Sequence, residues 1–310
     1  MLFRCACSVK HPAQFPTFPK HAVSQNRDSL RIFLKNDPDF LPENSEKELF
    51  KEITMNTSEI VRMIQPGSTL IIQASFKPCK QEGLTPEDLI AMLTARLGDE
   101  GTLLMPTFTY SYSGKKCEPY DPQTTPGCYN GILSETFRKT KGVLRSGNPT
   151  YSVAAWGKHA KYLTMDSEDD AGLGPGSSYA NALKLDVKLL LLNVGNNRNS
   201  MLHYAEIVSG VPYNDIPFRE SWGRTALTLH GEIALKNGFP ACSEAFSKFD
   251  EVFVRQGFSR KFGESFLIDA RKMVDYIVRE IRRKPDIMLC DNFDCEPCTL
   301  RRARLHAMLR

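Results

Sequence analysis

The chain has 310 residues, a length that suits one large α/β domain or two small ones. Charged residues make up 25% of it, and the formal net charge is +4. The charge is mild, and neither a Lys/Arg-rich tract nor an aromatic-plus-basic motif accompanies it, which argues against a nucleic-acid-binding protein. Neither a signal-peptide core nor an apolar run of membrane length occurs, so we expect a cytoplasmic protein with reduced thiols that does not contact a membrane.

Residues 1–50 differ from the rest of the chain in composition. They have little apolar periodicity and five prolines, which predicts a poorly ordered extension: Pro12, Pro16, Pro19, Pro38 and Pro42. We expect one globular domain over residues 51–285 and a cysteine-containing tail over residues 286–310.

The globular pattern opens with a strand–loop–helix–strand unit. Thr69–Ala74 is a predicted strand, and residues 75–83 are a predicted loop. Thr85 is the predicted N-cap of a helix that Gly98 ends, and residues 102–105 form the next predicted strand. This order favours two parallel strands joined by a right-handed crossover.

A long segment, residues 107–131, is rich in Tyr, Pro and Gly. A loop of this length in a compact domain is either functional or packed over the core, and the residues leave both alternatives open. A short predicted helix over residues 132–140 follows. Basic residues cluster at its end, as either a solvated face or a phosphate-binding patch: Arg138, Lys139, Lys141 and Arg145.

The later elements are predicted from period and turn signals. We expect a strand at 151–156, a helix beginning at Ser177 or Ser178, a hairpin at 225–235 turning at Gly231, and helices at 243–256 and 268–283. An acidic run occupies residues 166–170, and it is either a solvated cap or a feature that attracts amines.

The stretch from Val187 to Glu206 is the most informative. Its first residues, 187–192, are nearly all apolar and predict a central strand buried on both faces. A polar loop follows, and then a helix with Ser200 as its predicted N-cap. His203 would then lie in the first helical turn at the sheet edge where α/β proteins bind ligands, and a helix N-terminus favours the neutral imidazole.

Glu206 lies three residues after His203, near the same helix face, and could hold the imidazole ring or steer a cationic substrate. The alternative for His203 is a histidine that only caps or packs.

Three C-terminal cysteines, Cys290, Cys295 and Cys298, have the spacing C-x4-C-x2-C. Metal ligation needs a fourth ligand, which His306 or Cys242 could supply, and a reduced tail without metal is the alternative. We assign no metal from the sequence. Cys79 is not assigned as a nucleophile, because no His or Asn near it in sequence supports activation.

Five segments together resemble the aminoglycoside 3-N-acetyltransferase family. They occur in order as FKPCKQEGLTPEDLIAMLTARLGDEGTLLMPTFT, YDPQTTPG, GILSETFRKTKGVLRSGNPTYSVAAWG, GPGSSYANALKLD and LLLLNVGNNRNSMLHYAE. The resemblance covers about residues 58–285. It implies a three-layer α/β/α sandwich with a mostly parallel central sheet, distinct from the more common acetyltransferase fold. It also implies acetyl transfer from acetyl-CoA to a small-molecule amine.

The resemblance implies roles for seven residues. His203 matches the expected general base, and Glu206 matches the acidic position that follows it. The positions expected to bind CoA are Ser75, Lys77, Arg145 and Ser152. Asp121 matches the Asp of the Y/F-D-P segment, which we expect to flank the amine site.

The sequence departs from the family at one segment. The pattern H-P-T-H-S is here Asn148-Pro-Thr-Tyr151-Ser152, so both histidines are replaced. This change bears on the identity of the acceptor more than on the acetyl-CoA reaction. Three hypotheses therefore stand: an enzyme acetylating an aminoglycoside-like antibiotic, an enzyme acetylating another amine, and a CoA-binding protein without catalysis. A homodimer is a candidate assembly.

The reaction also predicts what the site must contain. An ammonium has no lone pair, so the acceptor must lose a proton before it attacks the thioester, and a neutral His203 would accept that proton. The oxyanion then needs hydrogen-bond donors, for which the backbone N–H groups near Ser75 and Gly195 are candidates.

Overall fold

The computed structural model describes residues 55–115, 117–165, 172–235 and 238–308. The chain divides into Met1–Lys51 and Glu52–Arg310, and all described residues belong to the second unit. The predicted N-terminal extension and the acidic run at 166–170 lie outside the described residues. None of the helices in the described part of the chain combines the length and apolar character needed to cross a membrane.

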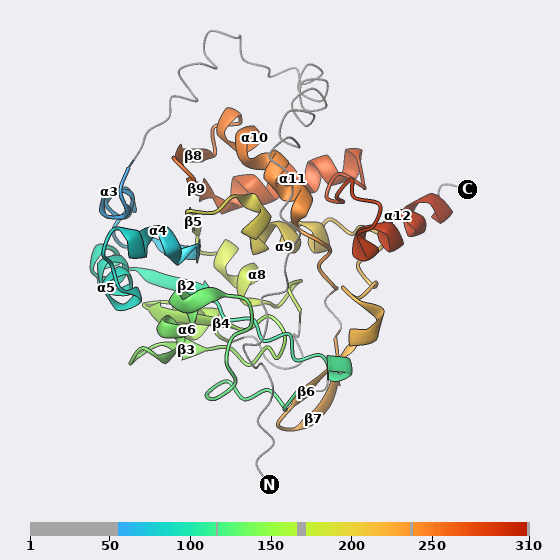
Figure 1. The fold of residues 1–310 in the computed structure, drawn as a ribbon, viewed down its shortest axis with the longest axis horizontal. Helices are drawn as coiled ribbons and strands as arrows, with labels where there is room; N and C mark the ends of the chain where they lie inside the picture. The colour runs from blue at the N-terminus through green and yellow to red at the C-terminus, as the bar shows by residue number, and fades with distance from the viewer. Residues whose placement is uncertain (1–54, 116, 166–171, 236–237, 309–310) are drawn as a thin grey trace. The chain divides into compact units, whose positions relative to one another are not determined.

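A seven-stranded sheet forms the centre of this unit (Figure 1), with the strand order β3-β4-β2-β1-β5-β9-β8. The strands are β1 (Thr69–Ala74), β2 (Thr102–Pro106), β3 (Leu144–Arg145), β4 (Val153–Gly157), β5 (Lys188–Leu192), β8 (Ser259–Phe262) and β9 (Ser265–Asp269). The three central strands β2, β1 and β5 are parallel neighbours. Only β4 and β9 run in the opposite direction, because each pairs antiparallel with its neighbours.

Alternating side chains of the central strands are buried on both faces of the sheet. Leu70 and Ile72 of β1 and Leu190 of β5 belong to a core cluster that includes residues of the helices α3 (Thr57–Arg62), α5 (Pro86–Leu97) and α6 (Gly131–Lys139). The intervening Ile71 and Leu189 are also fully buried. A strand that is apolar on both faces must be covered by a layer of helices on each side, which explains the three-layer architecture.

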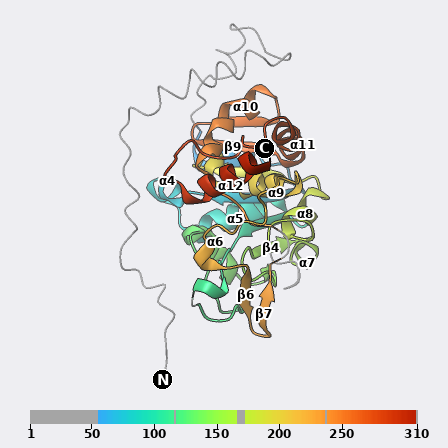
Figure 2. The same ribbon diagram turned by 90° about the vertical axis from the view of Figure 1, so that its right-hand side faces the viewer.

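The helices form the two outer layers. In Figure 2, α4 (Phe76–Gln81) and α6 lie on one side, and α7 (Ala160–Leu163), α8 (Ser178–Leu183) and α11 (Ala270–Arg283) lie on the other. The helix α9 (Ser200–Val208) packs against both α8 and α11. The predicted α/β/α sandwich with a mostly parallel central sheet is therefore confirmed.

The helix α5 follows its sequence signals closely. The Thr85 side chain accepts a hydrogen bond from the backbone N–H of Asp88, while the Asp88 carboxylate accepts one from the N–H of Thr85, completing a capping box. Pro86 occupies the first helical position, and Gly98 ends the helix with φ +68°, a conformation that favours glycine.

Two predictions for the later chain were wrong. The expected helix at 268–283 begins only at Ala270, because Ile268 belongs to β9, which pairs with β8 and β5. The expected helix at 243–256 is divided into a 3-10 segment, η6 (Glu244–Lys248), and α10 (Phe249–Arg255). The predicted hairpin is present as β6 (Thr225–Thr228) and β7 (Gly231–Ala234).

The predicted tail at 286–310 contains α12 (Glu296–Met308), which packs within the same unit. Its Arg301 is fully buried, and the guanidinium donates hydrogen bonds to the carbonyl oxygens of Ile216 at 2.6 Å and Pro240 at 3.2 Å. This helix therefore joins two earlier segments of the chain.

Candidate active site

His203 lies near the start of α9, the helix that follows the C-terminal end of β5. The loop between them contains the short 3-10 segment η4 (Asn196–Arg198). The N-cap of α9 is Asn199, whose side chain accepts a hydrogen bond from the N–H of Met201, so the prediction that Ser200 is the cap was wrong by one residue. His203 is the fourth residue of the helix, and 14% of its side chain is exposed.

Two side chains orient the His203 ring. Its Nδ1 lies 3.3 Å from Oε2 of Glu206, three residues along the same helix. The ring of Phe246, in η6, lies against the imidazole with 4.8 Å between the two centroids. The carboxylate selects the tautomer with the proton on Nδ1, which leaves the lone pair on Nε2.

Glu206 is itself held from a third element. Its side chain is fully buried, and its Oε1 accepts a hydrogen bond from the hydroxyl of Tyr213 at 3.2 Å. Burial raises the pKa of Tyr213, so the phenol stays protonated and available as a donor. The side chains of His203, Glu206 and Tyr213 therefore form a continuous chain of hydrogen bonds.

Gln73, near the end of β1, connects that strand to the start of α9. Its Nε2 donates to Oγ of Ser200 at 2.8 Å, and its Oε1 accepts from the N–H of Ser200 at 3.0 Å. The backbone N–H of Ser75 donates to the carbonyl oxygen of Leu192 at 3.0 Å. The Ser75 N–H is thus occupied in this conformation and is not a free donor for an oxyanion.

The loop before α9 is fixed by Asp250 of α10. One carboxylate oxygen of Asp250 accepts hydrogen bonds from both the backbone N–H and the side-chain Nδ2 of Asn196, each at 2.8 Å. Asn196 in turn accepts a hydrogen bond from Asn199, the helix cap, at 2.8 Å. A Cβ at Gly195 would lie 2.8 Å from Oδ2 of Asp250, so a side chain here would require the Asp250 carboxylate to move.

The segment after β1 is helical, so the prediction of a loop at 75–83 was wrong. Ser75 is the N-cap of α4, and Lys77 lies exposed in the first turn of that helix. Cys79 is fully buried and accepts hydrogen bonds from Thr57 and Asn193, both at 3.5 Å. Burial raises the pKa of the Cys79 thiol, which disfavours the reactive thiolate.

Arg145 and Ser152 meet at Thr107, but both are engaged within the protein. Arg145 donates to Oγ1 of Thr107 at 3.1 Å, to its carbonyl oxygen at 2.8 Å, and to the carbonyl oxygens of Pro122 and Thr125. Ser152 is fully buried and donates to the same Thr107 carbonyl at 2.7 Å. In this conformation both side chains hold the 107–131 segment in place, rather than presenting free groups to CoA phosphates.

Asp121 lies in the same segment and has a partly exposed side chain. Its carboxylate accepts hydrogen bonds from the N–H of Gln123 at 2.8 Å and the hydroxyl of Thr124 at 2.7 Å. These two bonds lower the pKa of Asp121, so the side chain is negatively charged at neutral pH. No hydrogen bond joins it to the His203 group within the described residues.

The family is decided by comparison with known proteins. Residues 71–282 match the family model described as aminoglycoside 3-N-acetyltransferase. The chain belongs to this family of acyltransferases.

The relatives of this chain align with most of its length. It is 38% identical over 235 residues to aminoglycoside N(3)-acetyltransferase IV from a Salmonella species, an alignment covering 73% of this chain and 85% of the relative. It is 26% identical over 249 residues to aminoglycoside N(3)-acetyltransferase VII from Streptomyces paromomycinus, covering 70% and 86% respectively.

Solved structures agree with this assignment. The apoenzyme of aminoglycoside acetyltransferase AAC(3)-IVa superposes with a TM-score of 0.68 at 28% identity, covering 82% of this chain and 99% of that one. The CoA complex of AAC-IIIb superposes with a TM-score of 0.59 at 23% identity, covering 74% and 97%, and supports the fold alone.

Where this member of the acetyltransferase family departs from the H-P-T-H-S pattern, the two substituted residues are buried. Oδ1 of Asn148 accepts hydrogen bonds from the N–H groups of Thr150 at 3.1 Å and Tyr151 at 2.9 Å. The hydroxyl of Tyr151 lies 2.6 Å from that of Tyr112. The substitutions therefore form part of a hydrogen-bonded interior.

The aromatic residues of the 107–131 segment are largely packed, which favours the alternative in which this segment covers the core. The ring of Phe108 lies edge-on to Tyr151 with centroids 5.2 Å apart, and Tyr112 lies against Trp222 with centroids 5.3 Å apart. Tyr112 and Tyr120 also form bridges to the β6–β7 hairpin.

The basic cluster near α6 is partly neutralised. Glu135 forms ion pairs with Arg138 at 2.5 Å and Lys139 at 2.9 Å. The Lys139 side chain is 63% exposed, which fits a solvated face, whereas the Arg138 side chain is only 5% exposed and is held by Glu135. This pairing argues against a phosphate-binding patch at these two residues.

Four residues of the site were not predicted from the sequence: Gln73, Tyr213, Phe246 and Asp250. Their contacts depend on how the elements pack, and a local sequence pattern does not reveal such contacts. A hydroxyl seven residues after Glu206 was a weak signal for Tyr213, because the chain turns back after α9 ends at Val208. Gln73 and Phe246 had no local signal.

Proposed function

We propose that this chain transfers an acetyl group from acetyl-CoA to an amine of an aminoglycoside-like acceptor, with His203 as the general base. The observation that carries the proposal is the chain of hydrogen bonds from Tyr213 through Glu206 to Nδ1 of His203. This chain of hydrogen bonds ends on α9, the helix that follows the C-terminal end of the parallel strand β5. Membership of the acetyltransferase family supplies the reaction class. Two neighbours are complexes of AAC(3)-IVa variants, one with a gentamicin and one with apramycin.

The proposed chemistry requires two protons to leave the acceptor nitrogen. The ammonium first releases one proton to solvent water, which gives an amine with a lone pair, and the nitrogen then attacks the thioester carbonyl carbon. Nε2 of His203 takes a proton from the nitrogen as the C–N bond forms. Collapse of the oxyanion breaks the C–S bond, and the imidazolium returns a proton to the departing sulfur. The buried carboxylate of Glu206 stabilises the transient imidazolium.

The charges around the site are suited to this substrate class. Asp121 is held as a carboxylate by Gln123 and Thr124, and it is our proposed contact to a cationic acceptor. Lys77 and Ser75 at the start of α4 remain the proposed contacts to CoA, because Lys77 is exposed and its ammonium can approach a phosphate. Arg145 and Ser152 are not included, because their polar atoms are used within the protein.

The experiment is an acceptor panel with acetyl-CoA. Release of CoA, corrected for thiols of the protein itself, is measured with aminoglycosides, with other primary amines and without acceptor. Release with aminoglycosides supports the proposal. Release only with other amines favours the same chemistry on a metabolic acceptor, and tight CoA binding without release under any condition favours a non-catalytic protein.

The role of His203 is tested by His203→Ala. We expect kcat to fall about 10²–10⁴-fold while the dissociation constant for CoA stays within a factor of about two, because only proton transfer is removed. His230→Ala is the matched control, since His230 is an exposed histidine in the turn of the β6–β7 hairpin. Near wild-type turnover by the His203 variant would exclude it as the base.

A further inference from the structure

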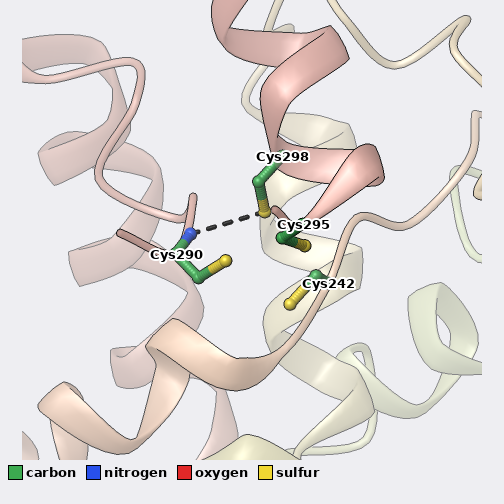
Figure 3. Close-up of side chains that lie close together, drawn as sticks. All are labelled: Cys242, Cys290, Cys295 and Cys298. Atoms are coloured by element: carbon green, nitrogen blue, oxygen red, sulfur yellow. Dashed lines mark hydrogen bonds between the residues drawn. The ribbon is translucent and has the colours of Figure 1, made fainter. Parts of the chain in front are cut away.

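Four cysteines from three separate parts of the chain converge on one point (Figure 3). The sulfur atoms of Cys242, Cys290, Cys295 and Cys298 all lie within 4.8 Å of one another. Cys298 is fully buried, Cys242 and Cys290 are also buried, and Cys295 is intermediate. The fourth member is Cys242, 48 residues before Cys290 in the sequence, and not His306.

The cluster lies where α12 meets two earlier segments. Cys242 precedes η6, Cys290 lies in the connection after α11, and Cys298 is in the first turn of α12, with Cys295 just before that helix. Figure 3 shows the four sulfur atoms pointing into a common space between these elements. Side chains from distant segments that converge in this way are typical of a structural metal site.

We propose that these four cysteines bind one Zn²⁺ ion as a structural tetrathiolate site. Zinc–sulfur bonds of about 2.3 Å in a tetrahedron put neighbouring sulfurs about 3.8 Å apart, so shifts of roughly 1 Å or less bring the present arrangement to that geometry. The C-x2-C pair at the start of α12 has the ligand spacing that zinc sites use. With four protein ligands no coordination position stays open for substrate, so the site stabilises the fold and takes no part in the transfer reaction.

The surroundings of the cluster suit thiolates. The backbone N–H of Cys290 donates to the sulfur of Cys298 at 3.4 Å, and the N–H of Glu244 donates to the sulfur of Cys242 at 3.3 Å. Donors of this kind are the outer-shell partners that orient metal ligands and stabilise their charge.

Arg301 provides a second, independent observation. It lies three residues after Cys298 in α12 and is fully buried, and within the described residues its hydrogen bonds go to backbone carbonyl oxygens and not to a carboxylate. A buried cation without a counter-charge is costly. A Zn²⁺ ion with four thiolates carries a net negative charge, which supplies the missing counter-charge nearby.

Disulfides are the competing use of these thiols. Two disulfides require two close pairs, and they do not require that all four sulfur atoms approach one another. None of the four cysteines forms a disulfide in the structure, and every sulfur–sulfur separation in the cluster falls under the same limit. This symmetry favours a single central ion. Iron also accepts four thiolates, and it is distinguished from zinc by the test below.

The first experiment uses the wild-type protein purified without added metal or chelator. We expect about one zinc per chain by elemental analysis, together with release of that zinc when a mercurial reagent modifies the four cluster thiols, which peptide mapping distinguishes from the other cysteines. Cobalt exchanged into the site should give the visible absorption of tetrahedral thiolate coordination. Stoichiometric iron, a disulfide between cluster cysteines in peptide mapping by mass spectrometry, or a folded protein without metal whose four cluster thiols are all free would each overturn the zinc assignment.

The second experiment compares cysteine variants. Cys298→Ser should reduce bound zinc at least about tenfold, whereas Cys128→Ser, outside the cluster, should leave it near one per chain. If Cys298→Ser is insoluble, Cys295→Ser replaces it, because the Cys295 side chain is partly exposed. Full zinc retention by both cluster variants would refute the proposal. Zinc content is independent of acetyl transfer, so failure of the proposed function leaves this result interpretable.

Discussion

The edge of the central sheet and the C-terminal region are built by different means. At the sheet edge, β5, the following loop and α9 are consecutive in sequence, and the carboxylate nearest the imidazole belongs to Glu206, less than one helical turn after His203. Phe246 and Gln73 add contacts from elsewhere in the chain. In the C-terminal region, Cys242 and Cys298 are 56 residues apart, and their meeting depends on how α12 packs. The first region is therefore visible in the local sequence pattern, although distant residues complete it, whereas the second depends wholly on contacts between distant segments.

The two regions also meet. Phe246 lies four residues after Cys242 and packs on the His203 ring, and the hydroxyl of Tyr213 lies 3.2 Å from both Glu206 and the carbonyl oxygen of Pro285. The C-terminal region therefore supports the orientation of the proposed base, although it contributes no reacting group. The following predictions test how far the two regions are separable.

The largest expected effect after loss of His203 itself is that of Glu206→Gln. The amide keeps the shape of the side chain but cannot stabilise the imidazolium, so we expect kcat to fall about 10–100-fold with little change in KM for acetyl-CoA. Tyr213→Phe removes one hydrogen bond to the same carboxylate and should cost less than about tenfold. Steady-state kinetics measures both. A larger loss for Tyr213→Phe than for Glu206→Gln would contradict the proposed order of contacts.

Arg301→Met should destabilise the C-terminal region without acting at the site directly. It removes several hydrogen bonds from a buried guanidinium, and we expect the free energy of unfolding to fall by about 2–4 kcal/mol in urea titrations. Arg304→Met in the same helix is the control, because its ion pair with Asp215 is exposed and should contribute less than about 1 kcal/mol. Equal effects of the two variants would show that α12 is not anchored through Arg301.

The fold of the central region could largely be predicted from its residues, and the reasons are local. Apolar runs marked β1 and β5, and Thr85, Pro86 and Gly98 marked both ends of α5. The prediction failed at α4, a short helix containing Pro78 that has little apolar period, and at β9, whose apolar residues run directly into α11.

The proposed site could be predicted only in part, for a related reason. The pair His203 and Glu206 is visible because a helix brings residues three apart together. The contacts of Arg145 and Ser152 to Thr107 arise from the pairing of β4 with both β2 and β3, and no sequence period encodes them. The resemblance assigns these two residues to CoA binding, which stays a prediction, and their hydrogen bonds show an additional role in holding the 107–131 segment.

A pair of basic residues sharpens this distinction. Arg145→Lys cannot reproduce the forked contacts to the 107–131 segment, so we expect a loss of about 1–3 kcal/mol in stability with KM for acetyl-CoA little changed. Lys77→Met should have the opposite pattern, with unchanged stability and a KM for acetyl-CoA raised several-fold. Thermal unfolding and steady-state kinetics measure both variants. A raised KM for acetyl-CoA in Arg145→Lys, or a loss of stability in Lys77→Met, would contradict these assignments.

The smallest expected effect is the pH dependence contributed by Glu135. Partial burial acts to raise its pKa, but hydrogen bonds from Arg138 and Lys139 prevail and lower it to about 2. A depressed folded-state pKa stabilises the protein above the ordinary value of 4.5, and this contribution is lost as the pH falls toward about 2. Solvent screening limits it to below about 1 kcal/mol. Glu135→Gln should make the unfolding free energy depend less steeply on pH between about 4.5 and about 2. A pH dependence equal to that of the wild type would count against a stabilising role of the ion pairs.

The contact between Gly195 and Asp250 limits which substitutions this enzyme can accept in the loop before α9. The backbone at Gly195 has φ −89°, which alanine tolerates, but an added methyl group would meet the carboxylate that holds Asn196. Displacing that carboxylate would loosen the cap of the helix bearing the imidazole. Selection for turnover is therefore expected to keep residue 195 a glycine, while residues that do not touch the cap of α9 are freer to change.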